Sequence, residues 1–221
     1  MLRVALREGY CVNVPAFDDL IVRVDRSGRA LSREEQRTAL TIYPRWMARI
    51  AEFAVETCLS QGDILRLTED MVDWRRGVIV PEGGRKKTGV HQVAPLTQRA
   101  REILAEIRAE KNEMTIPNVS GLIFTRDNGT SVSKDMLRAQ IKKAISSGLR
   151  KFKFHDYRNT AMTQWRRKGI PVDAVMRAGG WTSVQMYKRY LDMNEDDIAN
   201  AFGTSQIGKR IDKRNSATRR K

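Results

Sequence analysis

Apolar side chains recur at helical spacing in three separate stretches of the chain, and this periodicity is the strongest constraint on its fold. The first stripe follows Pro44, a residue suited to the first turn of a helix. The three stripes consist of Trp46, Ile50, Phe53, Ala54 and Thr57; of Ala100, Ile103, Leu104 and Ile107; and of Leu137, Ile141, Ala144 and Ile145. Such faces are usually buried, so we expect them to form the core of one mostly helical domain.

A block of short β-like runs interrupts the helices. The runs are Met71–Trp74, Val78–Val80 and His91–Ala94, with turn residues at Gly77 and at the pair Gly83-Gly84. We expect a small antiparallel three-stranded sheet in an α+β, mostly helical fold. Other helices are expected from Ser32, from His155 to the break at Gly169-Ile170-Pro171, over Val172–Arg177 and over Val184–Tyr190.

The two ends of the chain differ in character from its middle. Residues 1–30 read as a helix remnant, Leu2–Tyr10, and a linker broken at Asn13-Val14-Pro15. The last nineteen residues, from Gly203, carry seven Lys or Arg against one Asp. They have almost no large apolar side chains with which to fold. We therefore expect one domain at 31–203, a mobile basic tail at 204–221, and further protein upstream of the remnant.

The charge balance favours a polyanionic partner. The chain has 41 Lys and Arg against 26 Asp and Glu, a formal charge of +15. Nucleic acid is the commonest polyanion in a cell, although a basic surface can also serve solubility alone. Cys11 and Cys58 lack the spacing of a zinc site, and no segment has the length of a signal peptide or a membrane span. We expect no metal, no membrane insertion and a cytoplasmic, nucleoid-associated protein.

Three short motifs are candidates for chemistry. They are Lys87-Thr88-Gly89, His155-Asp156-Tyr157-Arg158, and Gly180-Trp181 followed by Tyr190. His155 and Arg158 are three residues apart, hence neighbours near a helix N-terminus, where free N–H groups favour an anion. Each motif alone also has a structural explanation, as a hairpin charge, a capping histidine or a core aromatic.

In their order and spacing these motifs resemble the active-site motifs of tyrosine recombinases and phage integrases, over residues 32–202. The resemblance implies that Tyr190 attacks a DNA phosphodiester and forms a 3′-phosphotyrosyl link without a cofactor. It also implies that Arg158, His155 and Trp181 stabilise the negative charge, and that Lys87 protonates the departing 5′-oxygen. Tyr187, one helical turn earlier, is the alternative nucleophile.

The resemblance further implies double-stranded DNA as the partner and a homotetramer assembled on it. In that arrangement the basic residues Arg85 and Lys86, beside the hairpin lysine, contact phosphates. Lys209 and Arg210 do the same from the tail.

The sequence departs from the family pattern at an important position. Ser60 stands where the first catalytic arginine is expected, and the acidic residue three positions later is kept as Asp63. Loss of one such cation costs about 10³ to 10⁵ in rate in comparable phosphoryl-transfer sites. Arg66, Arg85 or Lys86 are candidates to fill the gap. A milder departure is Asn159, where a basic or imidazole residue is common.

Two functional hypotheses follow from these observations. In the first, the chain is a site-specific recombinase that integrates or excises a mobile element. In the second, it is a catalytically impaired relative that binds DNA or a partner recombinase as an accessory factor. Ser60 and the absence of an N-terminal DNA-clamping domain favour the second, and the five-residue set Lys87, His155, Arg158, Trp181 and Tyr190 favours the first.

Overall fold

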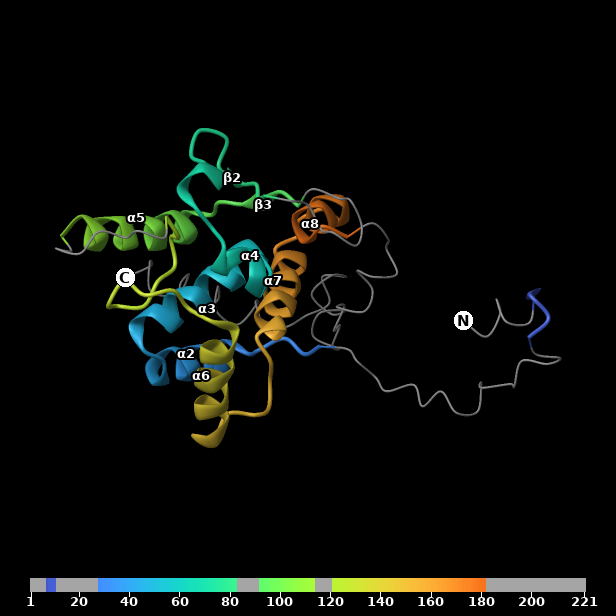
Figure 1. Ribbon diagram of the computed structural model, residues 1–221, viewed down its shortest axis with the longest axis horizontal. Coiled ribbons are helices and arrows are strands. Elements are labelled where there is room, and N and C mark those ends of the chain that lie inside the picture. Colours follow the sequence, from blue (N-terminus) through green and yellow to red (C-terminus); the bar gives the residue numbers. More distant parts are fainter. Residues whose placement is uncertain (1–6, 11–27, 83–91, 114–120, 182–221) are drawn as a thin grey trace, which may run out of the picture.

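The computed structural model describes residues 7–10, 28–82, 92–113 and 121–181. The last three of these ranges form a mostly helical domain with one small sheet (Figure 1). Its helices are α2 (Arg33–Ile42), α3 (Arg45–Thr57), α4 (Gln61–Leu65), α5 (Gln98–Glu113), α6 (Lys134–Ser146), α7 (His155–Arg167) and α8 (Val172–Gly179), with a 3-10 turn, η2, at Glu69–Met71. In these ranges, no helix is both long enough and apolar enough to cross a membrane.

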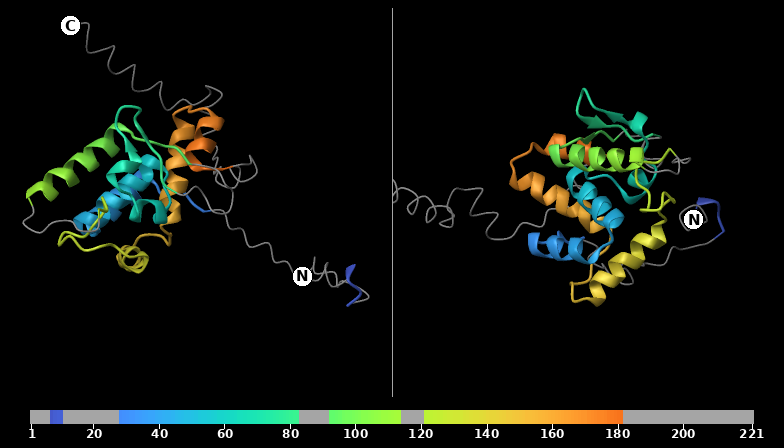
Figure 2. Two further views of the ribbon diagram at one scale, coloured as in Figure 1. Left: turned by 45° about the horizontal axis from the view of Figure 1, so that its top comes forward. Right: turned by 90° about the vertical axis from the view of Figure 1, so that its left-hand side faces the viewer.

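Helix α3 lies at the centre of the domain and packs against α2, α4, α5, α7 and strand β3 (Ala94–Pro95) (Figures 1 and 2). It begins directly after Pro44, which stands at the N-cap position and not in the first helical turn, where the sequence had placed it. All five residues of its predicted stripe are buried. The helix is apolar on most sides because other elements surround it on most sides.

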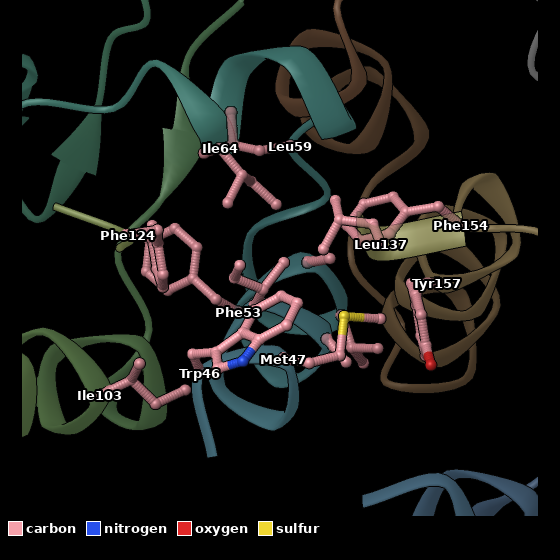
Figure 3. Close-up of a cluster of buried hydrophobic side chains, with 14 of the residues drawn as sticks. Trp46, Met47, Phe53, Leu59, Ile64, Ile103, Phe124, Leu137, Phe154 and Tyr157 are labelled. Carbon is pink, nitrogen blue, oxygen red and sulfur yellow. The ribbon is translucent and has the colours of Figure 1, made fainter. Parts of the chain in front are cut away.

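The core around α3 collects apolar side chains from Leu31 to Tyr157 (Figure 3). A second, smaller cluster joins Cys58 to α7, α8 and Trp181. The ring of Phe53 on α3 lies 4.8 Å from that of Phe124, centroid to centroid, with the planes tilted by 56°. Ile103 of α5 and Leu137 of α6 contribute from the other two predicted stripes, and both are fully buried. The three stripes therefore meet in one core, which confirms their reading as core faces.

The buried Arg49 ties α3 to α5 through an ion pair. Both terminal nitrogens donate to the carboxylate of Glu110, each at 2.6 Å, and Arg49 is only 8% exposed. The bidentate contact with Arg49 holds the pKa of Glu110 below its usual range. The charge of this arginine is thus matched by a carboxylate, as buried charges generally are.

The sheet has the antiparallel order β1-β2-β3, with β1 at Val72–Asp73, β2 at Val78–Ile79 and β3 at Ala94–Pro95. This confirms the predicted three-stranded meander. Gly77, with φ of +69°, makes the turn before β2. The third strand begins later than the predicted run, and Pro95 is tolerated in it because β3 pairs only with β2 and so lies at an edge.

The helix termini explain where the elements begin and end. Ser32 and Glu35 form a reciprocal capping box at the start of α2. Cys58 ends α3 in the left-handed conformation, with φ of +56°, and Gly180 does the same for α8. The short helix α4, which follows α3, was not predicted from the sequence, because five residues are too few to show a helical periodicity.

The segment that leads into the domain is packed against α7. The backbone N–H of Leu31 donates to Thr160 Oγ1 at 2.9 Å, and the Arg29 guanidinium donates to the carbonyls of Arg150 and Lys151. The predicted helices over Leu2–Tyr10 and Val184–Tyr190 lie partly or wholly outside the described residues, as does the basic tail. The domain boundaries near residues 30 and 203 stay predictions.

Two tyrosines meet in the core where α2 ends and α7 begins. The hydroxyl oxygens of Tyr43 and Tyr157 lie 2.7 Å apart, and both side chains are buried. Burial raises the pKa of Tyr43 to about 12, although the hydrogen bond from Tyr157 opposes the shift. Burial also raises the pKa of Tyr157 above its usual range, reinforced by Tyr43. Neither phenol is therefore suited to act as a nucleophile.

This pair should make the fold sensitive to alkaline pH. Unfolded tyrosine ionises near pH 10, whereas folded Tyr43 holds its proton to about 12. The stabilisation is complete below about pH 10 and is lost as the pH rises through the folded pKa. We expect the free energy of unfolding in urea to fall more steeply in this window for the natural protein than for the double variant Tyr43→Phe, Tyr157→Phe. Equal slopes would contradict the assignment.

Candidate phosphate-binding site at the start of helix α7

Helix α7 begins at His155, so the predicted motif stands at its N-terminal end. The N-cap residue, Phe154, provides no side-chain hydrogen bond to the helix. Asp156 in the first turn accepts instead from the backbone N–H of Lys153 at 2.8 Å and from Asn159 Nδ2 at 2.9 Å. His155 is exposed, whereas the next residues are buried. The helix thus presents His155 outward and carries Arg158 inward.

Arg158 is held in a fixed position by two backbone carbonyls. One terminal nitrogen donates to the carbonyl of Cys58 at 2.6 Å and the other to the carbonyl of Gly179. The side chain is 2% exposed, and its Nε has no hydrogen-bond partner among the described residues. Unlike Arg49, it makes no ion pair with a carboxylate in these parts of the chain. Within the described ranges, this buried and oriented guanidinium therefore has no carboxylate to balance its positive charge.

Trp181 covers this guanidinium from one side. The carbon Cζ of Arg158 lies 4.5 Å from the centre of the Trp181 ring system, which is a cation–π distance, and Trp181 is buried. A Cβ on Gly179 would stand less than 2 Å from two atoms of this ring, so only glycine lets the ring lie there. The adjacent glycines before Trp181 thus have separate duties, since Gly180 caps α8.

Gln92 makes a second pair of hydrogen bonds, beside those of Arg158, between the end of α3 and the end of α8. We call this pair the Gln92 clamp. Its Nε2 donates to the carbonyl of Ala178 at 2.6 Å and to that of Cys58 at 3.3 Å, and the side chain is 4% exposed. The Cys58 carbonyl therefore accepts from both Gln92 and Arg158. These bonds hold the start of the described segment 92–113 against the ends of α3 and α8.

A pocket of about 200 Å³ lies against Arg158. The ends of three helices surround it, namely the starts of α4, α6 and α7. Its lining consists of Leu59, Ser60, Gln61, Gly62, Lys134, Phe154, His155 and Arg158. The structure thereby brings together three predicted residues that are far apart in the sequence: Ser60, His155 and Arg158.

Ser60 has a definite structural role in this structure. Its Oγ accepts from the backbone N–H of Asp63 at 3.3 Å and donates to Asp63 Oδ2 at 2.5 Å, so it is the N-cap of α4. The other carboxylate oxygen of Asp63 accepts from Arg66 at 3.2 Å. Arg66 is thus paired with Asp63 and does not line the pocket. Of the three cations expected to fill the gap, the structure does not favour this one.

The remaining predicted residues lie outside the described parts of the chain. They are Lys87, Arg85, Lys86, Tyr190, its alternative Tyr187, Lys209 and Arg210. Among residues that are described, Asn159 is buried and bonded to Asp156, which gives the milder departure a structural explanation. Nowhere in the described ranges do three His, Cys, Asp or Glu side chains gather so as to hold a metal ion.

Sequence reasoning missed Gln92, Gly179 and Lys134. A polar glutamine in an apolar-alternating run was the available signal for Gln92, since an inward amide must find partners. Gly179 directly precedes the predicted Gly180-Trp181 motif, and no local sequence pattern shows that the two glycines have different roles. Lys134 carries no signal, because its place beside Ser60 and Arg158 depends on the packing of α6.

Comparisons with known proteins identify the family. A model of the phage integrase family matches residues 30–197, and the chain belongs to this family. The integrase of Salmonella phage P22 is 28% identical over 93% of the chain and 56% of its own length. A shufflon-specific DNA recombinase of Escherichia coli is 31% identical over 73% of the chain and 37% of its own length. The chain thus spans little more than half of one relative and less of the other.

Solved structures agree with the family assignment at the level of fold. A lambda integrase tetramer bound to a Holliday junction matches with a TM-score of 0.68 at 19% identity, over 86% of this chain and 56% of that one. The XerA recombinase matches with a TM-score of 0.65 at 15% identity, over 93% and 72% of the two chains. The predicted α+β tyrosine-recombinase catalytic fold is confirmed.

The cap at Ser60 leads to a stability prediction. Ser60→Ala removes both the acceptor for the Asp63 N–H and the bond to its carboxylate, so we expect a loss of about 1 kcal/mol in the free energy of unfolding. Ser146→Ala, at an exposed position of α6, is the control and should change stability by a few tenths at most. Urea denaturation measures both. Equal losses in the two variants would show that Ser60 is not an effective cap.

The Gln92 clamp leads to a second stability prediction. Gln92→Met keeps the length of the side chain and removes its donors, leaving the buried carbonyl of Ala178 without this partner. We expect a loss of about 1–3 kcal/mol. Gln98→Met, on the exposed side of α5, is the matched control. If thermal or urea denaturation finds the two variants equally stable, the clamp contributes nothing.

Proposed function

We propose that this chain binds double-stranded DNA and carries out site-specific recombination through a covalent tyrosine intermediate. The observation that carries the proposal is Arg158. It is buried, fixed by two carbonyls and an aromatic ring, and left without a carboxylate in the described structure. A buried cation of this kind is stabilised by an anion. In a phage integrase family member with a formal charge of +15, the phosphodiester of DNA is the fitting anion.

The proposed chemistry conserves the energy of the phosphodiester bond. The phenolic oxygen of Tyr190 forms a bond to phosphorus as the bond from phosphorus to the 5′-oxygen breaks. The phenol loses its proton, and the departing 5′-oxygen takes one up from Lys87. The products are a 3′-phosphotyrosine and a free 5′-hydroxyl. Attack by the 5′-hydroxyl of another strand reverses the step and releases the tyrosine.

The groups at the start of α7 stabilise the negative charge that builds on the phosphate oxygens. Arg158 has donors beyond the two that are bonded to carbonyls, and Nε–H is one of them. His155 stands exposed at the pocket and donates a further hydrogen bond. Trp181 holds the plane of the guanidinium and is a second donor candidate. Preorganised donors of this kind contribute about 3–4 kcal/mol each when they are aimed at developing charge.

A second candidate function is that of an accessory DNA-binding protein without strand cleavage. The observation that favours it is Ser60, whose hydroxyl is engaged with Asp63 and which brings no charge to the pocket. Both candidate functions predict DNA binding that weakens with salt. They differ in whether the protein forms a covalent adduct with DNA through its tyrosine.

The proposal includes assembly on DNA and a nucleoid location. The similar lambda integrase structure is described as a tetramer bound to a Holliday junction, and we extend a homotetramer to this chain. Phosphate contacts from Arg85, Lys86, Lys209 and Arg210 belong to the same proposal.

Covalent trapping tests the proposal. The natural protein is incubated with a pool of nicked duplexes, because the DNA site is not known, and SDS-resistant complexes are counted. We expect an adduct that disappears in Tyr190→Phe and persists in Tyr187→Phe, which is the matched control. An adduct lost in Tyr187→Phe alone would transfer the role of nucleophile to that residue.

Ser60→Arg separates the two candidate functions. If only this variant forms an adduct, the site is intact and was silenced at Ser60. If neither it nor the natural protein forms one while salt-sensitive DNA binding persists, the accessory function replaces the recombinase function. The variant should be assayed well below its unfolding temperature, because it also loses the cap of α4.

A further inference from the structure

The pocket against Arg158 also has a lysine in its lining. Lys134 is the first residue of α6 and lines the pocket together with Ser60, His155 and Arg158. Among the described residues of this lining it is the only lysine. Arg158 is almost completely buried, whereas Lys134 is exposed. The pocket therefore has one fixed cation on its inner side and one exposed cation at its edge.

The backbone of Lys134 is attached to the segment that contains Ser60. Gln61 Nε2 donates to the carbonyl of Lys134 at 3.5 Å, so the starts of α4 and α6 lie side by side. Ser133 caps α6 by accepting from the N–H of Met136 at 3.2 Å, which fixes the first turn of that helix. The base of the lysine side chain is thus placed next to Ser60, and its flexible stem spans the remaining distance.

The charge of Lys134 is not used elsewhere in the described structure. Its neighbours on the same surfaces are paired, since Arg138 bonds to Asp135 at 2.5 Å and Arg66 bonds to Asp63 at 3.2 Å. Lys134 has no carboxylate within 4.0 Å among the residues described. Of the exposed cations near Ser60, it is the one that both lines the pocket and has no acidic partner there.

A phosphodiester that is cleaved by an oxygen nucleophile needs more than one cation. Negative charge grows on two non-bridging oxygens, and a single guanidinium with two donors already bonded to carbonyls neutralises only part of it. Lysine binds phosphate as a point charge and needs no fixed fork geometry. An exposed lysine at the edge of the pocket meets this requirement.

We infer that Lys134 is the second phosphate-binding cation of this pocket and acts where Ser60 provides no charge. This inference rests on the proposed function, because it assigns a further residue to the same site. It is based on four observations: the shared lining, the Gln61 tether, the missing acidic partner and the unpartnered Nε of Arg158. Lys134 takes over charge neutralisation only, since its ammonium cannot reproduce a bidentate contact.

The first experiment measures phosphate binding without any DNA chemistry. Inorganic phosphate is titrated against the natural protein at constant ionic strength, and the midpoint of thermal unfolding is followed. We expect a rise that is saturable in the natural protein and in Lys134→Arg. Lys134→Ala should weaken the apparent affinity roughly tenfold or more. Lys142→Ala, an exposed lysine on the same helix outside the pocket, is the control and should behave as the natural protein.

Three results of this titration would overturn the inference. They are the absence of a phosphate effect in the natural protein, an unchanged affinity in Lys134→Ala, and an equal loss in Lys142→Ala. In the last case general surface charge, and not the pocket, would explain the binding.

The second experiment separates this inference from the proposed function. Adduct formation on nicked duplexes is compared among the natural protein, Lys134→Ala, Ser60→Arg and the double variant. We expect Lys134→Ala to slow the natural protein roughly tenfold or more and to slow Ser60→Arg less, because the new arginine covers the same charge. Equal slowing in both backgrounds, or none, would refute the assignment while leaving strand cleavage in place. Lys134-dependent phosphate binding without any adduct would refute strand cleavage and leave the assignment in place.

Discussion

The burial of α3 is the constraint on which the rest of the structure depends. This helix packs against α2, α4, α5, α7 and β3, so each of these elements is positioned by contact with it. A helix that is enclosed in this way ends at a point that is itself deep in the domain. Its last carbonyls and the left-handed Cys58 that follows therefore become part of the interior. The candidate site is built around that end.

The carbonyl of Cys58 joins three distant parts of the chain. Gln92 donates to it across 34 positions of sequence and Arg158 across 100. The same two side chains also bind the consecutive carbonyls of Ala178 and Gly179 at the end of α8. A carbonyl has two lone pairs, so one group can serve both donors. This arrangement fixes Arg158 by neutral groups, which orient the guanidinium and leave its charge available to a ligand.

Ser60 brings no charge to the pocket but supports its framework. The serine caps α4 and hydrogen-bonds to Asp63, so the start of α4 is stabilised without an arginine at this position. The buried arginines differ accordingly: Arg49 is matched by Glu110, and Arg158 is unmatched among the described residues. A site that keeps a buried uncompensated cation is disposed toward an anion, whichever of the two candidate functions holds.

The sequence by itself indicated most of the described helices, the three-stranded sheet and the family, and it singled out His155 and Arg158 as candidates. These depend on local quantities, such as the 3.6-residue period, turn residues and motif spacing, which a linear sequence displays. Only the tertiary structure decided that Gln92 shares the Cys58 carbonyl, that Trp181 lies over Arg158, and that Lys134 lies beside Ser60. Contacts between residues tens of positions apart depend on how the helices pack around α3, and packing is a property of the folded chain that no local pattern records.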